Sequence, residues 1–305
     1  MQLHIAITGA SGFIGAAAAA ELIKSGHRVT ALLRPESNPV RLISSPSVER
    51  FEYHNLADLK KFTALKHLKP DVFVHCGWRG VGGDDRNGDF QITENIQMSM
   101  NSVGLAAYLG CRHWIGLGSQ AEYGNQNCRL NEDASLRPTT LYGKAKLAAG
   151  IACLALAEAK GLSATWLRVF STYGPGDSPK WFLQYVLNEF SAGRSPELTL
   201  CTQLWDYLHV SDAARAIAAV AATPTATGVF NLGSGIALPL RHWLELLRNA
   251  INCQIEPKYG VVPFRIDQVM HLEADISRLT FATGWKPLVS PTDGIASLVA
   301  NNFAA

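Results

Sequence analysis

The sequence predicts an α/β protein built on a doubly wound parallel sheet, with a smaller lobe formed by the C-terminal part of the chain. Over the first two thirds, short runs rich in β-branched residues alternate with longer helical patterns, and a glycine-rich turn joins the first run to the first helix. After about residue 173 the elements become shorter and Gly, Pro and Ser cluster between them. We therefore expect a main domain over residues 1–172, re-entered by segments around 202–235, and a lobe over 173–305.

The strands and helices of the main domain follow one another in a regular order. The expected strands are 3–8, 28–33, 48–53, 71–76, 113–119 and 163–170. Helical patterns cover 13–25, 91–110 and 140–160. Gly26 and Gly161 supply C-terminal stops for the first and the last of these helices. Strands that alternate with helices of this length indicate parallel β-α-β units.

The C-terminal part reads as a set of shorter elements that leave and rejoin the main sheet. We expect helices near 180–192, 211–222 and 239–251, and a strand near 197–201. Residues 231–235 look like a turn-rich junction. Because no internal repeat or low-complexity linker is evident, a separate second domain with its own core is not expected.

Composition excludes several classes of protein. The chain has 305 residues, 48% of them hydrophobic, and its net charge of +2 gives no reason to expect nucleic acid or an anionic membrane as a partner. Neither a signal-peptide pattern nor an apolar run long enough to span a membrane is present. The six cysteines match no zinc-ligand spacing, and Cys76, Cys153 and Cys201 lie in apolar stretches. We expect a cytoplasmic protein without disulfides or structural metal.

The turn after the first strand, ITGASGFIG, has the spacing of a phosphate-binding loop. Its glycines recur every three residues between a strand and a helix. The first permits a tight turn, the second lets the backbone approach a pyrophosphate, and the third lets the helix pack closely on the strand. This context predicts a dinucleotide-binding Rossmann domain. The loop residues expected to bind the cofactor are Gly9, Ser11, Gly12, Phe13, Ile14 and Gly15.

The end of the second strand bears on the choice of cofactor. Leu33 stands where an NAD-binding site usually has an acid, and Arg34 follows it. A guanidinium at this place makes bidentate contacts to a phosphate, so Arg34 favours NADP over NAD. The alternative is an exposed arginine that touches no ligand.

A tyrosine, a lysine and a serine suggest proton transfer. Tyr142 and Lys146 lie four residues apart in the expected helix 140–160, so their side chains share one face. The ammonium then stabilises phenolate, and such a tyrosine exchanges a proton with an alcohol or carbonyl oxygen. Ser119 ends a predicted strand, at the sheet edge where ligands bind, and can hydrogen-bond the same oxygen. The alternative for Ser119 is a serine that only caps a turn.

Together with LRVFSTYGPG and DYLHVSDAARA, these motifs resemble the extended short-chain dehydrogenase/reductase family, and within it the NAD(P)-dependent nucleotide-sugar epimerases, dehydratases and ketoreductases. The resemblance runs nearly the whole length of the chain. It implies a sugar nucleotide between the two parts of the protein and a hydride that moves between nicotinamide and a sugar carbon. It further implies a catalytic triad of Ser119, Tyr142 and Lys146, with His75, Asn95, Tyr142 and Lys146 against the cofactor.

Departures from the family pattern narrow the expected reaction. Gln120 and Ala121 occupy the places of the Asp–Glu pair of the dehydratase branch, and Glu122 is one residue out of place, so dehydration is not expected. Trp205 stands where relatives often have a diphosphate-binding arginine, whereas Arg265 matches the other such arginine. The expected substrate-binding residues are Gln120, Ser171, Lys180, Trp205 and Arg265.

The cofactor argument favours net reduction. An epimerase keeps its NAD through the cycle, whereas a reductase exchanges its cofactor and usually draws on NADPH. GSQAEYG with WDYLHV also resembles the 4-ketoreductases of deoxy-sugar nucleotide pathways, such as CDP-abequose synthase. We therefore expect NADPH-dependent reduction of the C4 keto group of a nucleotide-linked deoxysugar.

Other readings stay open. One alternative is an NAD(P)-dependent nucleotide-sugar epimerase, with NAD as a possible cofactor. A non-catalytic NADP-binding sensor is the other, although a sensor would not need the serine, tyrosine and lysine. The resemblance also implies a homodimer formed by helices 91–110 and 140–160, whose Ala and Met content fits equally well with packing on the sheet.

Overall fold

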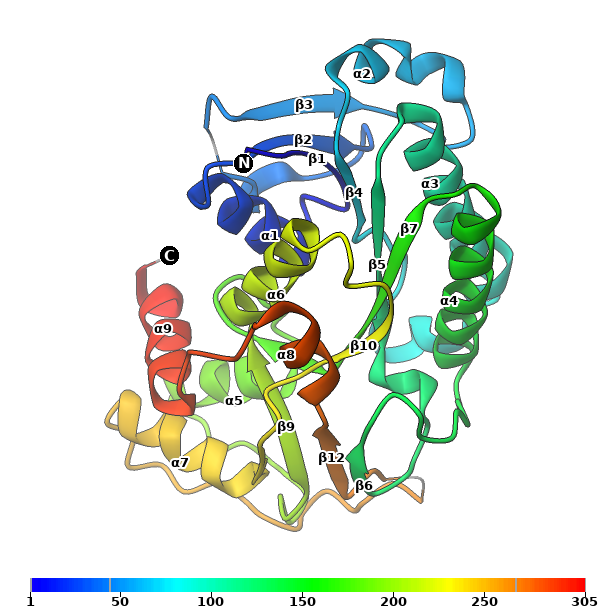
Figure 1. Ribbon diagram of the computed structural model, residues 1–305. Coiled ribbons are helices and arrows are strands. Elements are labelled where there is room, and N and C mark those ends of the chain that lie inside the picture. Colours follow the sequence, from blue (N-terminus) through cyan, green and yellow to red (C-terminus); the bar gives the residue numbers. More distant parts are fainter. Residues whose placement is uncertain (1, 44, 267, 305) are drawn as a thin grey trace.

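The computed structural model describes residues 2–43, 45–266 and 268–304. Within this part the main sheet has seven parallel strands in the order β10-β7-β5-β4-β1-β2-β3 (Figure 1). Their bounds are β1 His4–Thr8, β2 Arg28–Leu33, β3 Val48–Glu52, β4 Val72–His75, β5 His113–Ser119, β7 Ser163–Val169 and β10 Gly228–Leu232. The predicted α/β class with a doubly wound sheet is confirmed.

The order of the strands reverses beside β1. The chain moves outward from β1 to β2 and β3, then returns to place β4 on the other side of β1. Ligands of open α/β sheets bind at such a switch point, outside the carboxyl ends of the strands. The turn after β1 and the turn after β4 therefore define where a cofactor site is expected.

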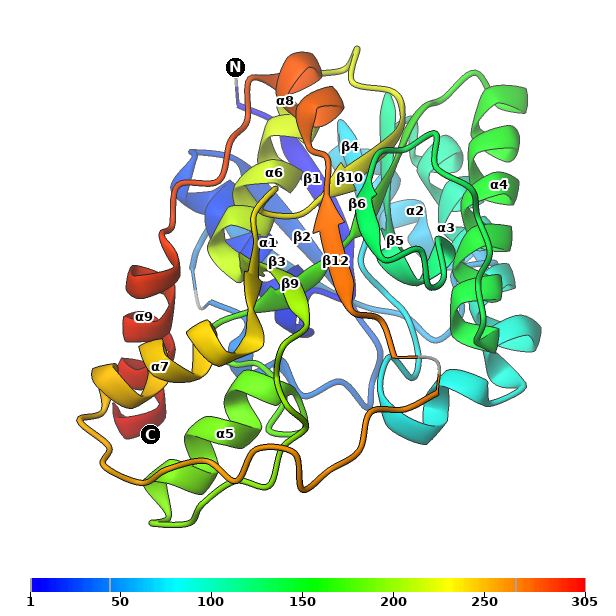
Figure 2. The ribbon, with the colours of Figure 1, turned by 90° about the horizontal axis from the view of Figure 1, so that it is seen from below.

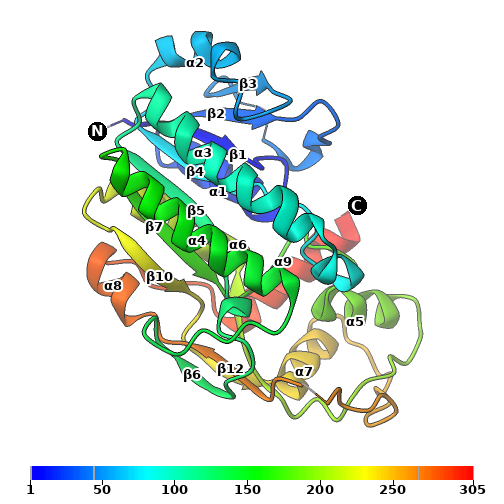
Figure 3. The same ribbon diagram turned by 90° about the vertical axis from the view of Figure 1, so that its right-hand side faces the viewer.

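Helices cover both faces of the sheet. α1 (Phe13–Lys24) and α6 (Val210–Ala222) pack on one face, and α3 (Ile96–Leu109) and α4 (Leu141–Ala159) lie side by side on the other (Figure 3). The alanine run in α1 lets it lie close to the sheet and to α6, with Ala18 and Ala19 fully buried. In α4, Ala145 and Ala149 are buried within this chain, whereas Ile151 is 64% exposed.

The lobe beside the main sheet draws its strands from distant parts of the chain. The second sheet has the order β11-β9-β12-β6, and β8 pairs with β9. Its strands are β6 Cys128–Leu130, β8 Ser171–Tyr173, β9 Leu204–His209, β11 Ala237–Pro239 and β12 His271–Ala274. Three helices pack around an apolar cluster next to it (Figure 2), namely α5 Phe182–Ser191, α7 Leu240–Ala250 and α9 Pro291–Ala304.

Most elements expected for the main domain lie within one or two residues of their predicted bounds. The expected helix 91–110 begins with a π turn, Gln91–Asn95, and α3 starts only at Ile96. Short elements were missed, among them α2 Thr63–Leu68 and α8 Ser277–Thr283. Residues 231–235, expected to be a turn, contain the end of β10.

The strand expected near 197–201 is wrong. Glu197 makes only an isolated bridge to Lys258, and Cys201 has a φ of 52°, which interrupts an extended chain. The true strand, β9, begins three residues later, where partners on both sides are available. No helix in the described ranges is long and apolar enough to cross a membrane.

Candidate active site

The glycine loop lies against the end of β4, at the switch point of the sheet. Gly9 has a φ of 68°, and a Cβ there would stand 2.7 Å from the backbone carbonyl carbon of Cys76. A Cβ on Gly15 would collide with the carbonyl oxygen of Gly9. These two positions therefore require glycine, because the turn and the helix pack with backbone against backbone.

The start of α1 fits a pyrophosphate. Gly12 is the N-cap of α1 and provides no side-chain cap, and the described first turn of the helix carries no acidic residue. The free N–H groups of the first turn of α1 and the positive end of the helix dipole face the end of the glycine loop, where they can bind a pyrophosphate. Ser11, Phe13 and Ile14 are partly exposed in the same turn.

Arg34 follows the last residue of β2, as expected. Its Nε lies 3.2 Å from a carboxylate oxygen of Glu36, and its side chain is 49% exposed. The guanidinium thus lies at the edge of the sheet, as predicted. The carboxylate of Glu36 beside it was not predicted. An acid in this place weakens an arginine's attraction for a phosphate.

His75 and Asn95 join the chain segments around the switch point, His75 through side-chain hydroxyls and Asn95 through the backbone. The two ring nitrogens of His75 bond the hydroxyls of Thr8 (2.7 Å) and Ser99 (3.3 Å), and burial, with a smaller effect of Lys146, lowers the pKa of His75 to about 3. The Asn95 amide bonds both the N–H (3.0 Å) and the carbonyl (2.9 Å) of Arg79. Both side chains are buried, and His75 is neutral at ordinary pH.

Ser119, Tyr142 and Lys146 meet at the carboxyl edge of the sheet. Ser119 is the last residue of β5, Tyr142 is the second residue of α4, and Lys146 follows one turn later. The hydroxyl of Ser119 lies near enough to the Tyr142 phenol to lower the pKa of that phenol. All three side chains are more than nine-tenths buried. The sequence thus identified three residues that the fold brings together, and their catalytic roles remain predictions.

Lys146 is directed away from the tyrosine. Its Nζ donates a 2.7 Å hydrogen bond to the carbonyl of Leu117 and lies 3.7 Å from the centroid of the Trp78 indole. The same nitrogen is 5.9 Å from the centroid of the Tyr142 ring. Burial lowers the pKa of Lys146 to about 7, although the carboxylate of Glu122 opposes this shift.

A second cation contacts the tyrosine. The guanidinium carbon of Arg86 lies 4.6 Å from the centroid of the Tyr142 ring. Burial raises the pKa of Tyr142, while the Ser119 hydroxyl and then the Arg86 charge lower it. The pKa of Arg86 is itself lowered, chiefly by burial and also by the nearby charge of Arg265, while Tyr142 opposes the shift.

Glu122 is fully committed to structural contacts. Its carboxylate accepts hydrogen bonds from the Ser119 N–H (2.9 Å), the Trp166 indole (3.0 Å) and the guanidinium of Arg168 (2.8 Å). It is completely buried, as one member of a buried ion pair. Glu122 therefore has no free oxygen edge to offer a sugar, and Gln120, half-buried at the start of the same turn, is an amide.

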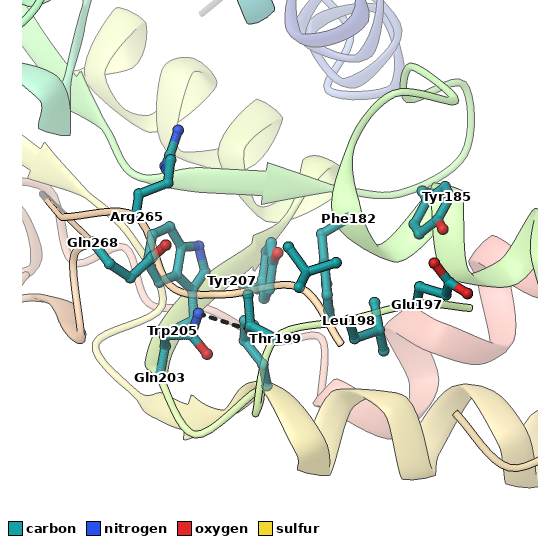
Figure 4. Close-up of a pocket in the computed structure, with 12 residues that line it drawn as sticks. Phe182, Tyr185, Glu197, Leu198, Thr199, Gln203, Trp205, Tyr207, Arg265 and Gln268 are labelled. Atoms are coloured by element: carbon teal, nitrogen blue, oxygen red, sulfur yellow. Dashed lines mark hydrogen bonds between the residues drawn. The ribbon is translucent and has the colours of Figure 1, made fainter. Parts of the chain in front are cut away.

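A pocket of about 330 Å³ opens in the lobe (Figure 4), and neither Tyr142 nor Lys146 is among the residues that line it. Trp205 and Arg265 both line it, and the Trp205 indole N–H donates to the Ser171 hydroxyl at 2.8 Å. Lys180 is exposed and does not line it. The lining is largely aromatic and apolar, formed by Phe182, Tyr185, Glu197, Leu198, Thr199, Gln203, Trp205, Tyr207, Leu240, Val262, Arg265 and Gln268.

The structure thus separates the expected site into two parts. Ser119, Tyr142 and Lys146 form one part, and Trp205, Arg265 and Ser171 belong to the other. Arg86 contacts Tyr142, and the charge of Arg265 lies near enough to lower the pKa of Arg86. Sequence reasoning missed Arg86 and Trp78. Their only signal was position, on the loop after β4, because the loops at this edge of the sheet carry ligands. The described residues hold no cluster of three potential metal ligands.

Known proteins share both the sequence pattern and the fold. The chain is 28% identical over 258 residues to a dTDP-6-deoxy-L-talose 4-dehydrogenase (NAD(P)(+)) of Kitasatospora kifunensis, covering 80% of this chain and 78% of that protein. It is 24% identical over 322 residues to a dTDP-glucose 4,6-dehydratase of Streptomyces griseus, covering 98% and 94% of the two chains.

Among solved structures, a UDP-N-acetylglucosamine 4-epimerase from Methanobrevibacter ruminantium, in complex with UDP-N-acetylmuramic acid, superimposes with a TM-score of 0.88. The match covers 99% of each chain at 21% identity and concerns the fold. Residues 5–233 match the sequence model of the NAD dependent epimerase/dehydratase family. The glycine loop, the switch point and the serine, tyrosine and lysine at the sheet edge all lie inside this range. The chain belongs to the NAD dependent epimerase/dehydratase family, whose members act on nucleotide sugars.

Proposed function

We propose that this protein uses NADPH to reduce the C4 keto group of a nucleotide-linked deoxysugar. Ser119, Tyr142 and Lys146 carry the proposal, because they meet at the sheet edge beside the loop that fits a pyrophosphate. The relative named as a 4-dehydrogenase of a dTDP-6-deoxysugar supports a redox reaction at C4.

Ser119, Tyr142 and Lys146 each have a separate role in the proposed carbonyl reduction. Bound NADPH would supply the hydride. Tyr142 gives its proton to the sugar oxygen, and the hydroxyl of Ser119, which lies beside that phenol, orients the carbonyl. Lys146, whose pKa is lowered to about 7 by burial, is able to gain or lose a proton near neutral pH, so it can return the proton to Tyr142 once its ammonium leaves the Leu117 carbonyl.

Dehydration of the sugar is disfavoured by the groups that follow Ser119. Gln120 and Ala121 provide no acid or base. Glu122 is occupied by Ser119, Trp166 and Arg168, and moving it would leave the Arg168 guanidinium unpaired in the core. Such an uncompensated buried charge costs several kcal/mol, about 3–5.

The lobe pocket is suited to the nucleotide end of the substrate. Its aromatic residues provide faces on which a base can stack, and Arg265 at its rim provides a charge for the diphosphate. Among the described residues, the side-chain carbonyl of Gln203 is a buried acceptor without a partner, and it lines this pocket. An N–H group of a base would satisfy that acceptor. We assign Gln120, Ser171, Lys180 and Trp205 to the sugar and diphosphate path as part of the same proposal.

The preference for NADPH depends on Arg34. Its guanidinium is at the expected strand end, whereas the neighbouring Glu36 favours the ribose hydroxyls of NAD. Replacing each residue in turn separates these effects. Arg34→Gln should weaken NADPH binding at least tenfold and leave NADH binding nearly unchanged, while Glu36→Gln should strengthen NADPH binding.

The second candidate is a nucleotide-sugar epimerase. The structural likeness to the 4-epimerase favours it, since the two proteins share a fold. The two candidates differ in how they hold the cofactor. A reductase must release oxidised cofactor in every cycle, whereas an epimerase is expected to be purified with NAD bound.

The first experiment is therefore to purify the protein, identify any retained nucleotide by mass spectrometry, and titrate NADPH against NADH. Empty protein that prefers NADPH, and that oxidises NADPH when given a nucleotide-linked 4-keto-6-deoxysugar, supports the proposal. Retained NAD together with interconversion of C4 epimers would replace it by the epimerase. Neither activity, despite tight NADP binding, would support a sensor.

Tyr142→Phe tests the mechanism. It should lower turnover by at least a thousandfold, because the proton donor is gone, while cofactor binding changes little. Tyr108→Phe is the matched control, since Tyr108 also lies under a lysine ammonium but on α3, outside the site. A Tyr142→Phe enzyme that still turns over would refute the assigned role.

A further inference from the structure

Arg86 is placed against the tyrosine by its own short helix. It lies in η3 (Gly83–Asn87), a 3-10 turn in the loop that follows β4, and its guanidinium carbon is 4.6 Å from the centroid of the Tyr142 ring. The side chain is half-buried, so water screens its charge less than that of a surface arginine. A guanidinium at this distance is attracted to the ring face and to any negative charge that forms on the phenol.

The backbone of this turn is fixed on both sides. The Asn87 side-chain carbonyl accepts the N–H of Leu141 at 3.2 Å, which ties η3 to the first residue of α4, immediately before Tyr142. The fully buried Gln91 amide donates to the carbonyls of Asp85 (2.9 Å) and Gly80 (2.5 Å). Arg86 and Tyr142 are therefore held next to each other by bonds to Asp85 and Asn87, on either side of Arg86, and to Leu141, directly before Tyr142.

The other charged groups described around Tyr142 do not supply a constant positive charge to its phenol. The Lys146 ammonium is bonded to the Leu117 carbonyl and lies on the Trp78 indole, and its charge is weakened by burial. The carboxylate of Glu122, on η5 (Gln120–Glu122), opposes phenolate formation. Arg265, from the lobe, is a further positive charge near Arg86 and does not neutralise it.

We propose that Arg86 is a positioning residue that acts through Tyr142, where its permanent charge stabilises the phenolate left when the tyrosine gives up its proton. The role rests on the proposed function, in which Tyr142 is the proton donor. A guanidinium suits it because it stays protonated at every pH at which the enzyme works. Arg86 thus supplies constant positive charge, and Lys146 is free to exchange a proton.

The charge effect can be measured without substrate. Tyrosines are replaced by 3-fluorotyrosine, whose phenol ionises at lower pH than that of tyrosine, and each of the 8 tyrosine signals is followed by ¹⁹F NMR against pH. The signal missing from Tyr142→Phe identifies Tyr142. In Arg86→Met its titration midpoint should rise by about one pH unit or more, because an adjacent opposite charge is lost. In Arg86→Lys, most of this rise should be absent.

The same loop offers a matched control. The guanidinium carbon of Arg79 lies 4.4 Å from the centroid of the Phe90 ring, and Arg79 pairs with the exposed Glu94. Arg79→Met removes an equivalent cation from an equivalent ring contact, and the Tyr142 midpoint should not move. An unchanged midpoint in Arg86→Met, with the other signals as in the wild type, would overturn the proposal.

Turnover provides the second readout. In Arg86→Met, kcat for the keto sugar should fall about tenfold, with the alkaline limb of its pH profile moved upward and KM little changed, and Arg86→Lys should restore most of the rate. A raised KM with an unmoved profile would instead make Arg86 a substrate ligand and refute the positioning role. If no keto sugar is reduced, the proposed function fails, while the NMR titration still decides the effect of Arg86 on Tyr142.

Discussion

Replacing Lys146 by methionine should make the protein more stable at neutral and mildly acidic pH. The ammonium is only 4% exposed and its pKa is lowered by burial to about 7. A depressed pKa means that the folded state binds the proton less well than the unfolded state does. Below pH 7 the lysine is charged in both states and the full cost of burying that charge opposes folding. Between pH 7 and 10.5 this cost disappears as the folded state loses the proton.

The size of the effect follows from the shift. The difference between the ordinary value of 10.5 and about 7 is about 3.5 pH units, which corresponds to about 5 kcal/mol. Methionine has a similar shape but loses the hydrogen bond to the Leu117 carbonyl, at a cost of about 1–3 kcal/mol. Lys146→Met should therefore be about 2–4 kcal/mol more stable than the wild type at pH 6. At pH 9.5, where about 1.4 kcal/mol of the penalty remains, the two should be nearly equal.

Urea denaturation of the cofactor-free protein at pH 6, 8 and 9.5 measures this difference. Lys144→Met, on the exposed side of the same helix, is the control and should stay within about 0.5 kcal/mol of the wild type at each pH. A Lys146→Met protein that is less stable than the wild type at pH 6, or a difference that does not change with pH, would refute the reasoning.

Two further predictions concern buried polar groups. Glu122→Gln should destabilise the protein by about 3–5 kcal/mol in urea denaturation, because it leaves the Arg168 guanidinium unpaired in the core. Adding Arg168→Met should recover part of the loss, and a double variant no more stable than Glu122→Gln alone would contradict the account. Since burial lowers the pKa of His75 to about 3, the unfolded state binds a proton below pH 6.5 that the folded state does not, and stability falls as the pH drops. Between pH 7 and 5 the wild type should therefore lose about 2 kcal/mol more than His75→Asn, and equal losses would show that another group is responsible.

The main domain was predictable because local signals and the global fold agree in it. Apart from β3, whose sequence VERFE is mostly charged, each strand of this sheet up to β7 is a short apolar run followed by a turn or helix signal, and the glycine loop marks the first crossover. The lobe lacks such agreement. The apolar run at 197–201 resembles a strand, but the chain bends at Cys201, and β9 forms where β12, β8 and β11 supply hydrogen-bond partners.

The candidate site was predictable only where spacing in the sequence defines it. Tyr142 and Lys146 share a helix face, so four residues of separation suffice to bring them together. Arg86 is brought to Tyr142 by a contact between Asn87 and Leu141, which are 54 residues apart. No local sequence pattern predicts this contact. The ion pair between Glu122 and Arg168, 46 residues away, likewise forms only in the packed core, and no local sequence pattern predicts it.

The lobe also has a consequence for how the chain is synthesised. β6 leaves the ribosome as residues 128–130 but has no strand beside it until β12, residues 271–274, follows almost half a chain later. The outer edge of β7 similarly waits for β10, residues 228–232. A nascent chain therefore carries unpaired strand edges through almost half of its elongation, and such edges invite pairing with other chains. We expect fragments that stop before residue 271 to aggregate rather than to fold as a smaller enzyme, and the yield of soluble protein to depend on chaperones that shield those edges during translation.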